Sequence, residues 1–164
     1  MADSEMLGNH FIQQARSHLS HDSMPKIKRC IDLLDEGDIW WRSHVTDNSI
    51  GNLILHLSGN VRQWVIAGVG GKPDVRERPK EFSQRDPLSK ESLWQALENT
   101  MKEADQVLDH LSPEKLLERK TIQGFDQTFL QVILHVVEHF SFHTGQIIYI
   151  TKLRKGVDLK FYNL

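Results

Sequence analysis

The feature that most constrains the fold is a helical pattern over residues 128–154, where apolar side chains occur on nearly every side of the predicted helix. Its central part reads FLQVILHVVEHFSFHTGQIIYITKL. A helix with so little polar surface needs other helices around it, which is typical of a central element of a bundle. Strand-like alternation of apolar and polar residues is nearly absent from the rest of the chain. The sequence therefore predicts an all-α protein.

Two helical segments are predicted in the first part of the chain. Residues 4–34 have helical periodicity, and Pro25 within them predicts either two helices or one kinked helix. Residues 49–67 form the second segment, because apolar residues recur there at i, i+4, i+7, i+11 and i+15. These residues are Ile50, Ile54, Leu57, Val61 and Val65.

A third helix is predicted to begin after Ser89 and to end before Pro113. Its core-facing residues keep a clean helical spacing: Leu93, Leu97, Met101, Ala104 and Leu108. With the helix over residues 128–154, the predicted architecture is a four-helix bundle. We expect a single helical domain that spans residues 1–164.

The segments between these helices carry stop and cap residues. Gly37 is expected to end the first helical segment, and Ser49 with the two polar residues before it offers caps for the second. The polar residues 68–87 predict a long connection between the second and third helices. Residues 112–127 fit no helix clearly, and a short hairpin around Gly124 is one alternative.

Charge and composition argue against two classes of partner. The 20 Lys and Arg are scattered among 22 Asp and Glu, for a formal net charge of −2, so we expect no nucleic-acid binding. No apolar run approaches the roughly 20 residues that span a bilayer, and the N-terminal residues lack the pattern of a signal peptide. The single Cys30 suits a reducing compartment, so a cytoplasmic location is predicted. Cys30 keeps the helical period of its neighbours, which favours a buried thiol over a nucleophile.

Histidines in the most apolar segment indicate a metal site. His135, His139 and His143 recur at i, i+4 and i+8, so they lie on one face of the helix. The outer two are separated by about 12 Å along the axis, whereas metal–nitrogen bonds are about 2.0–2.1 Å long. One ion can therefore bind two successive members of the series, and a further ligand must come from another helix.

His56 is the best candidate for that further ligand. It lies next to the core position Leu57 in the second helix, where a buried imidazole needs partners for its nitrogens. A backbone carbonyl or a water molecule would satisfy it as a core residue, and a metal ion is the alternative. Asn60 and Gln63 could then hydrogen-bond the ligands. Three histidines would leave one coordination position open, which is typical of catalytic rather than structural metal sites.

A competing motif uses a different pair of ligands. His135, Glu138 and His139 spell H-x-x-E-H, the signature of inverted zinc peptidases, in which Glu138 would be the general base. This short pattern arises easily by chance. The sequence after His139 leaves no room for a distant carboxylate ligand and a substrate domain, so we do not favour this interpretation.

Two elements together resemble the DinB/YfiT-like superfamily: H-L-S-G-N-x-R-Q-W beginning at His56, and H-F-S-F-H-T-G-Q-I beginning at His139. The resemblance covers essentially the whole chain, including the GVGG…D.R.R..EF connection at residues 68–82, and is closest to an uncharacterised bacterial branch. It implies a four-helix bundle, often a homodimer, with a divalent metal ion, zinc or nickel. Carried over by position, the metal ligands are His56, His139 and His143, and His135 is an additional pocket residue.

The resemblance also implies a set of functions. Some relatives are similar to thiol S-transferases or isomerases that use a low-molecular-weight thiol such as bacillithiol or mycothiol, and others to metal-dependent hydrolases. We therefore expect a metal-dependent enzyme, with thiol transfer first and hydrolysis as the alternative. The metal would lower the pKa of a bound thiol or water. A non-catalytic stress-response bundle with a structural metal is the third hypothesis. No catalytic side chain and no organic cofactor-binding residue is identified.

The connection over residues 68–87 is expected to stay away from the metal. It starts about 18 Å along the helix from His56. Its arginines, among them Arg76 and Arg78, alternate with acidic residues, a pattern more typical of internal ion pairs than of an anion site. We therefore predict that it covers a bundle end or a dimer contact and does not bind substrate.

Overall fold

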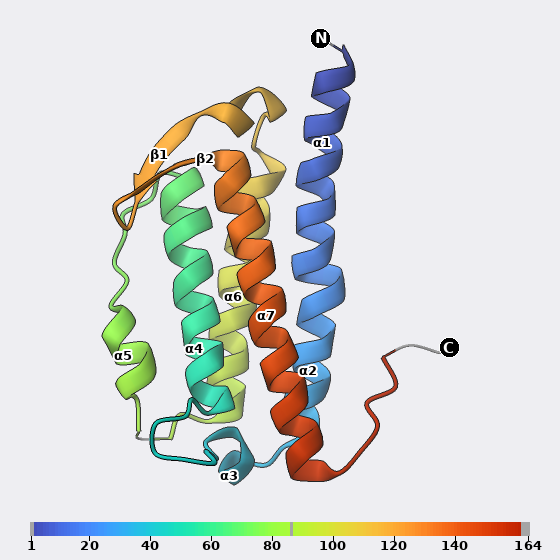
Figure 1. The fold of residues 1–164 in the computed structure, drawn as a ribbon, viewed down its shortest axis with the longest axis vertical. Coiled ribbons are helices and arrows are strands. Elements are labelled where there is room, and N and C mark those ends of the chain that lie inside the picture. Colours follow the sequence, from blue (N-terminus) through green and yellow to red (C-terminus); the bar gives the residue numbers. More distant parts are fainter. Residues whose placement is uncertain (1, 86, 162–164) are drawn as a thin grey trace.

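The computed structural model describes residues 2–85 and 87–161, and these are predominantly helical, which confirms the predicted all-α class. The longest helical segments lie side by side (Figure 1). They are α1 (Ala2–Ser17) with η1 (His18–Ser23) and α2 (Met24–Leu33), α4 (Ile50–Val61) with η2 (Arg62–Val69), α6 (Lys90–Asp109) and α7 (Phe129–Lys155). Helix α7 contacts α2, α4 and η2, as expected for the most apolar segment.

The N-terminal helical segment continues through the region of Pro25. Pro25 lies in the first turn of α2, the part of a helix that tolerates proline best. The preceding turn, η1, is π-helical, and the N–H of Met24 donates to the carbonyl of Leu19, five residues back. The wider turn therefore keeps the backbone bonded where a regular α-helix would break.

Side chains at the helix starts fix the bounds of the other segments. Ser49 and Asn52 form a reciprocal capping box at the start of α4, and Thr128 and Gln131 form another at the start of α7. The hydroxyl of Ser89 accepts a hydrogen bond from the backbone at the start of α6. These caps agree with the helix starts predicted from the sequence.

Short elements occupy the connections. They are α3 (Glu36–Ile39), α5 (Arg78–Ser83), η3 (Pro113–Leu117), β1 (Arg119–Ile122) and β2 (Phe125–Thr128). Strands β1 and β2 pair antiparallel, with Ile122 opposite Phe125 across a turn in which Gly124 has a φ of 81°. The hairpin around Gly124 is thus confirmed.

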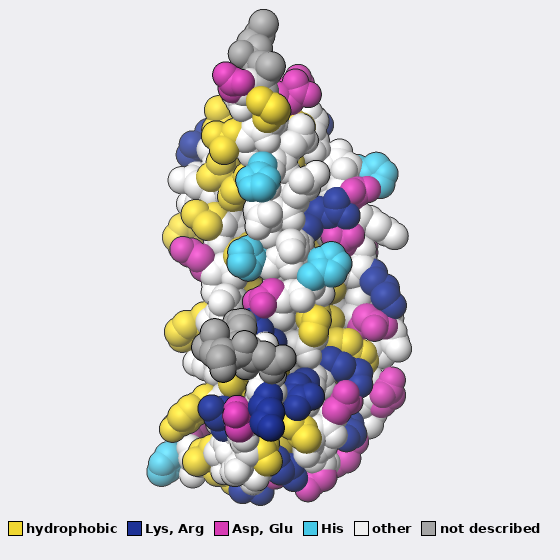
Figure 2. Space-filling model, turned by 90° about the vertical axis from the view of Figure 1, so that its right-hand side faces the viewer, with side chains coloured by type: hydrophobic (Ala, Val, Ile, Leu, Met, Phe, Trp, Pro, Cys, Tyr) yellow, Lys and Arg dark blue, Asp and Glu magenta, His cyan; other side chains and the backbone are white. Residues whose placement is uncertain are grey.

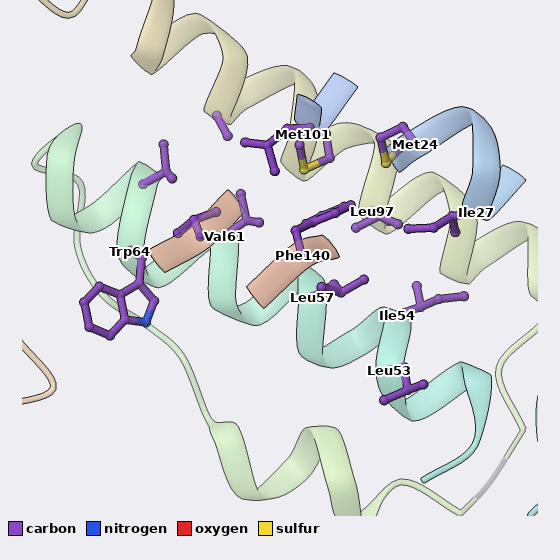
Figure 3. Close-up of a cluster of buried hydrophobic side chains, with 14 of the residues drawn as sticks. Met24, Ile27, Leu53, Ile54, Leu57, Val61, Trp64, Leu97, Met101 and Phe140 are labelled. Atoms are coloured by element: carbon purple, nitrogen blue, oxygen red, sulfur yellow. The ribbon is translucent and has the colours of Figure 1, made fainter. Parts of the chain in front are cut away.

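The core is built from the facing sides of the long helices. Figure 3 shows side chains of α2, α4, α6 and α7 in contact at its centre, with Phe140 of α7 between Leu57 of α4 and Leu97 of α6. Phe140 is 1% exposed, and full burial of such a side chain contributes about 1.5–3 kcal/mol. This packing fixes α4 against α7 and so fixes the distance between their histidines.

The direction of the helices explains the path of the long connection. Helices α4 and α6 run the same way, so the chain must return along the whole length of the bundle between them (Figure 1). We call residues 70–89 the return segment; the short helix α5 lies within it, next to α4. The expectation that this connection covers one end of the bundle is therefore wrong, and the alternative of a dimer contact stays a prediction.

The surface carries both signs of charge. On the face that includes α1, acidic side chains lie among the basic ones (Figure 2). Among the described residues, no helix has the length and apolarity needed to cross a bilayer.

Candidate metal site

His56, His139 and His143 come together between α4 and α7. One ring nitrogen of each lies within 4.8 Å of the others, and the three form a group that could hold a metal ion. The Nε2 atoms of His56 and His139 lie 2.8 Å apart. The three residues proposed from the sequence thus share one place in the fold, although they come from two helices.

Local sequence explains why these rings meet. His56 follows the apolar stripe of α4 and is 4% exposed, while His139 and His143 are one helical turn apart on α7. The ring of His56 lies 4.9 Å from that of His139 and 5.0 Å from that of His143, measured between centroids. It therefore faces both α7 histidines.

The nitrogen spacing fits a metal ion. With metal–nitrogen bonds of 2.0–2.1 Å, two ligands at a tetrahedral angle have nitrogens about 3.3 Å apart. The observed distances, from 2.8 Å up to the 4.8 Å limit, bracket that value, so small rotations of the rings suffice. A set of three imidazoles is suited to zinc and to nickel.

Hydrogen bonds at the opposite nitrogens orient two of the rings. His56 Nδ1 lies 2.8 Å from Oε2 of Glu81, and His143 Nδ1 lies 2.7 Å from Oε1 of Gln146. Because both oxygens can only accept, each Nδ1 carries the proton and donates. The Nε2 lone pairs of both rings are then free for a metal, as in carboxylate–histidine–metal sites.

Glu81 is held as a carboxylate by Arg76. The guanidinium donates from Nε to Oε1 at 2.7 Å and from Nη2 to Oε2 at 2.9 Å. Burial alone would raise the pKa of Glu81, but the hydrogen bonds from Arg76 and His56 outweigh it and lower that pKa. Nη2 of Arg76 also lies 3.1 Å from His56 Nδ1. While Nδ1 of His56 donates to Glu81, neither this nitrogen nor Nη2 of Arg76 can accept a hydrogen bond from the other. The two nitrogens are close because both donate to Oε2 of Glu81.

The α7 histidines are neutral at pH 7. Burial lowers the pKa of His139 to about 3, and repulsion by the neighbouring histidines adds to the effect. Burial also lowers the pKa of His143. Neutral imidazole is the form that binds metal.

A pocket of about 320 Å³ adjoins the group. His56 and His139 lie in its wall, beside aromatic, amide and guanidinium side chains. The other lining residues are Asn60, Trp64, Arg76, Arg78, Gln123, Phe125, Gln127 and His135. A small molecule in this pocket would therefore touch two of the three histidines.

His135 belongs to the pocket and lies outside the group of three. Its ring packs against Trp64 at 4.5 Å and stacks on His139 at 5.5 Å between centroids. Glu138 is exposed and is not among the residues that line the pocket. The geometry therefore agrees with His135 as a pocket residue and gives the H-x-x-E-H interpretation no support among the described residues.

The prediction that the connection stays away from the site is wrong. Arg76 and Glu81 contact His56, the ring of Phe82 lies 4.7 Å from that of His56, and Arg78 lines the pocket. The axial distance from His56 to the end of its helix was a poor guide, because the return segment runs back along α4. The ion pairing expected within this segment is present between Arg76 and Glu81.

The predicted partners of the ligands differ in part as well. Asn60 lines the pocket, and Oε1 of Gln63 accepts from Nη1 of Arg76 at 2.9 Å. Gln63 therefore contacts Arg76 and not one of the three histidines, and Glu81 is the residue that hydrogen-bonds His56. The glycine at position 59, inside a helix, is the sequence signal that could have indicated a close approach there.

Comparison with known families matches most of the chain to a family model. The model of a family described as "Protein of unknown function (DUF1572)" matches residues 6–163. No curated protein matches the chain.

Proposed function

This chain belongs to the DUF1572 family, and from its histidine group we propose that it is a DinB-like metal-dependent enzyme. In this proposal His56, His139 and His143 hold one divalent ion, zinc or nickel. The single observation that carries it is the convergence of three buried or half-buried imidazole nitrogens within 4.8 Å beside a pocket.

The roles of the side chains follow from their contacts. A divalent ion bound there would supply Lewis acidity and lower the pKa of the water or thiol that it binds. Glu81 and Gln146 hold the rings of His56 and His143 with Nε2 toward the ion. His135 and Trp64 pack against each other at an interplanar angle of 49° and line the same pocket.

The pocket favours an anionic substrate. Arg76 and Arg78 both line it, and no acidic residue is among its described lining residues. Glu81 neutralises Arg76, whereas Arg78 packs over Phe82 with its guanidinium 5.0 Å from the ring. A carboxylate or phosphate on the substrate would therefore pair with Arg78.

Thiol S-transfer remains the first reaction proposed, and metal-dependent hydrolysis is the alternative. Both need an open ligand position that faces the pocket, which three histidines provide. A non-catalytic bundle with a structural metal would instead need a fourth protein ligand, and the described residues offer three in the group. The homodimer and the cytoplasmic location stay predictions.

Metal analysis followed by an activity screen tests the proposal. Purified protein should contain one equivalent of zinc or nickel, and His143→Ala should lose it, while the exposed His110→Ala keeps it. Metal-loaded protein is then screened for conjugation of low-molecular-weight thiols and for ester hydrolysis. A protein that neither retains nor binds either metal would refute the proposal.

The anionic substrate class has its own test once a reaction is found. Arg78→Gln should raise KM for an acidic substrate more than for its neutral amide. Lys80→Gln removes an equal charge from the same helix, outside the pocket, and should leave both KM values unchanged. Equal effects of Arg78→Gln on both substrates would contradict pairing with an anion.

A further inference from the structure

Gly59 leaves a recess on α4 that the Arg76–Glu81 pair fills. A Cβ atom at position 59 would lie 2.0 Å from Oε1 of Glu81 and 3.0 Å from Nε of Arg76. Any side chain there would push the pair away from the helix. Glycine inside a helix costs about 1 kcal/mol relative to alanine, so its presence marks a place where close approach matters.

The pair in this recess is almost fully buried. The side chain of Arg76 is 3% exposed and that of Glu81 is 9% exposed. Removing two charges from water costs free energy that their attraction often fails to recover, so buried ion pairs are weak evidence of added stability. The geometry indicates another role for the pair, because Oε2 of Glu81 accepts a hydrogen bond from Nδ1 of His56.

Further contacts hold the return segment against α4. Nδ2 of Asn52 donates to the carbonyl of Glu81 at 2.8 Å. The ring of Phe82 packs on His56 from the adjacent position. Earlier in the segment, Asp74 accepts a hydrogen bond from Nε2 of Gln63 at 2.7 Å. Glu81 is thus held at its backbone and at both carboxylate oxygens.

From these contacts we propose that Glu81 is a positioning residue for the metal site, and that docking of the return segment at Gly59 sets the affinity of His56 for the ion. The inference rests on the proposed metal binding and adds that the return segment controls the affinity for the metal. With Glu81 in place, His56 has its proton on Nδ1 and its lone pair on Nε2, the nitrogen that faces His139. Without Glu81, the ring populates both tautomers and rotates more freely.

Coupling of this kind acts in both directions. If docking of the return segment strengthens metal binding, metal binding must strengthen docking by the same factor. The ion should therefore protect the backbone of residues 76–84 from exchange with solvent, although none of these residues is among the ligands proposed.

Zinc titration against a competing chromophoric chelator measures the first direction. Glu81→Gln keeps the size of the side chain and should weaken zinc binding about 10- to 100-fold. Gly59→Ala should also weaken it, because it displaces Glu81 without altering a ligand. Gly51→Ala is the matched control: Gly51 lies on the same helix as Gly59, and its Cβ would meet Trp40 at 2.9 Å and not Glu81. It should lower stability and leave zinc affinity unchanged.

Two further measurements separate positioning from a general loss of structure. In the wild type without metal, the ¹⁵N resonances of His56 should report a proton on Nδ1, and in Glu81→Gln they should report a mixture of tautomers. Hydrogen exchange should show that saturating zinc protects residues 76–84 in the wild type and much less in Glu81→Gln, at equal helix content by circular dichroism.

The outcomes are distinct. If the wild type binds zinc and Glu81→Gln binds it equally tightly, the positioning role is refuted while the metal site stands. Equal losses of affinity in Gly59→Ala and Gly51→Ala would refute the role of the recess. A wild type that binds neither zinc nor nickel refutes the proposed function, and this inference with it.

Discussion

His56 and His139 face each other through their Nε2 atoms, 2.8 Å apart, although 83 positions separate them in the sequence. Without a metal, one ring must donate its proton to the lone pair of the other. With a metal, both Nε2 lone pairs would point to the ion, so the proton between the two rings would move to Nδ1 of its own ring. Metal binding and the tautomer of this pair are therefore linked.

The first prediction concerns which histidines hold the ion. His56→Ala and His143→Ala should lose the metal, His139→Ala should bind it much more weakly, and His135→Ala should retain it, because its ring only stacks on His139. Elemental analysis of each purified variant measures the content. Loss in His135→Ala with retention in His143→Ala would show that the ligand assignment is wrong.

The second prediction is that metal-free protein loses stability in acid. The folded-state pKa of His139 is lowered to about 3 by burial, against 6.5 when unfolded, so the unfolded chain binds more protons between these values. The free energy of unfolding should thus decline as pH falls below about 6.5. Urea denaturation at pH 7 and pH 5 in the presence of a chelator measures it. His139→Asn should decline less, and an equal decline would exclude His139 as a source.

The third prediction compares two phenylalanines on α7. Phe140 is 1% exposed at the centre of the core, whereas Phe142 is 64% exposed. Phe140→Ala should cost about 3–5 kcal/mol through lost burial and a cavity, and Phe142→Ala should change stability by about 0.5 kcal/mol or less. Denaturant titration of both variants is the measurement. A large loss in Phe142→Ala would mean that a partner covers this face.

The fourth prediction compares the effect on stability of replacing two exposed glycines. Gly156 ends α7 with a φ of 62°, a conformation that costs other residues about 1–2 kcal/mol. Gly145 lies inside α7 with nothing near its missing Cβ. Gly156→Ala should therefore lower the melting temperature, and Gly145→Ala should raise it. Shifts of the same sign would contradict this account of the helix end.

The fifth prediction is that Cys30 is unreactive in the native protein. It is fully buried, and burial raises the pKa of its thiol. Iodoacetamide near pH 8 should label it only after denaturation, as measured by mass spectrometry. Rapid labelling of the native protein would revive the nucleophile interpretation.

The helices and the shared face of the histidines were predictable because local signals determine them. The caps at Ser49 and Thr128 lie where the residue types indicate, and the four-residue spacing of His139 and His143 fixes their common face. The apolar stripe that contains Leu57 likewise places His56 against α7. Each of these inferences needs information from one helix only.

The part that sequence reasoning missed depends on contacts between distant segments. Nothing local to Glu81 indicates that it lies beside His56, 25 positions earlier. Its position follows from the parallel run of α4 and α6, which sends the return segment back past the histidines. Gly59 was the available sequence signal, because a glycine in the interior of a helix often marks a place where another group approaches closely.

The hairpin β1–β2 has a consequence for how such a protein can diversify. Its residues Gln123, Phe125 and Gln127 line the pocket, yet Ile122 is its only described side chain in the buried core, where it packs against Gly68. We therefore expect changes in the composition of this turn to leave the core of the bundle intact. Substitutions in the hairpin would reshape one wall of the pocket without replacing any of the three histidines.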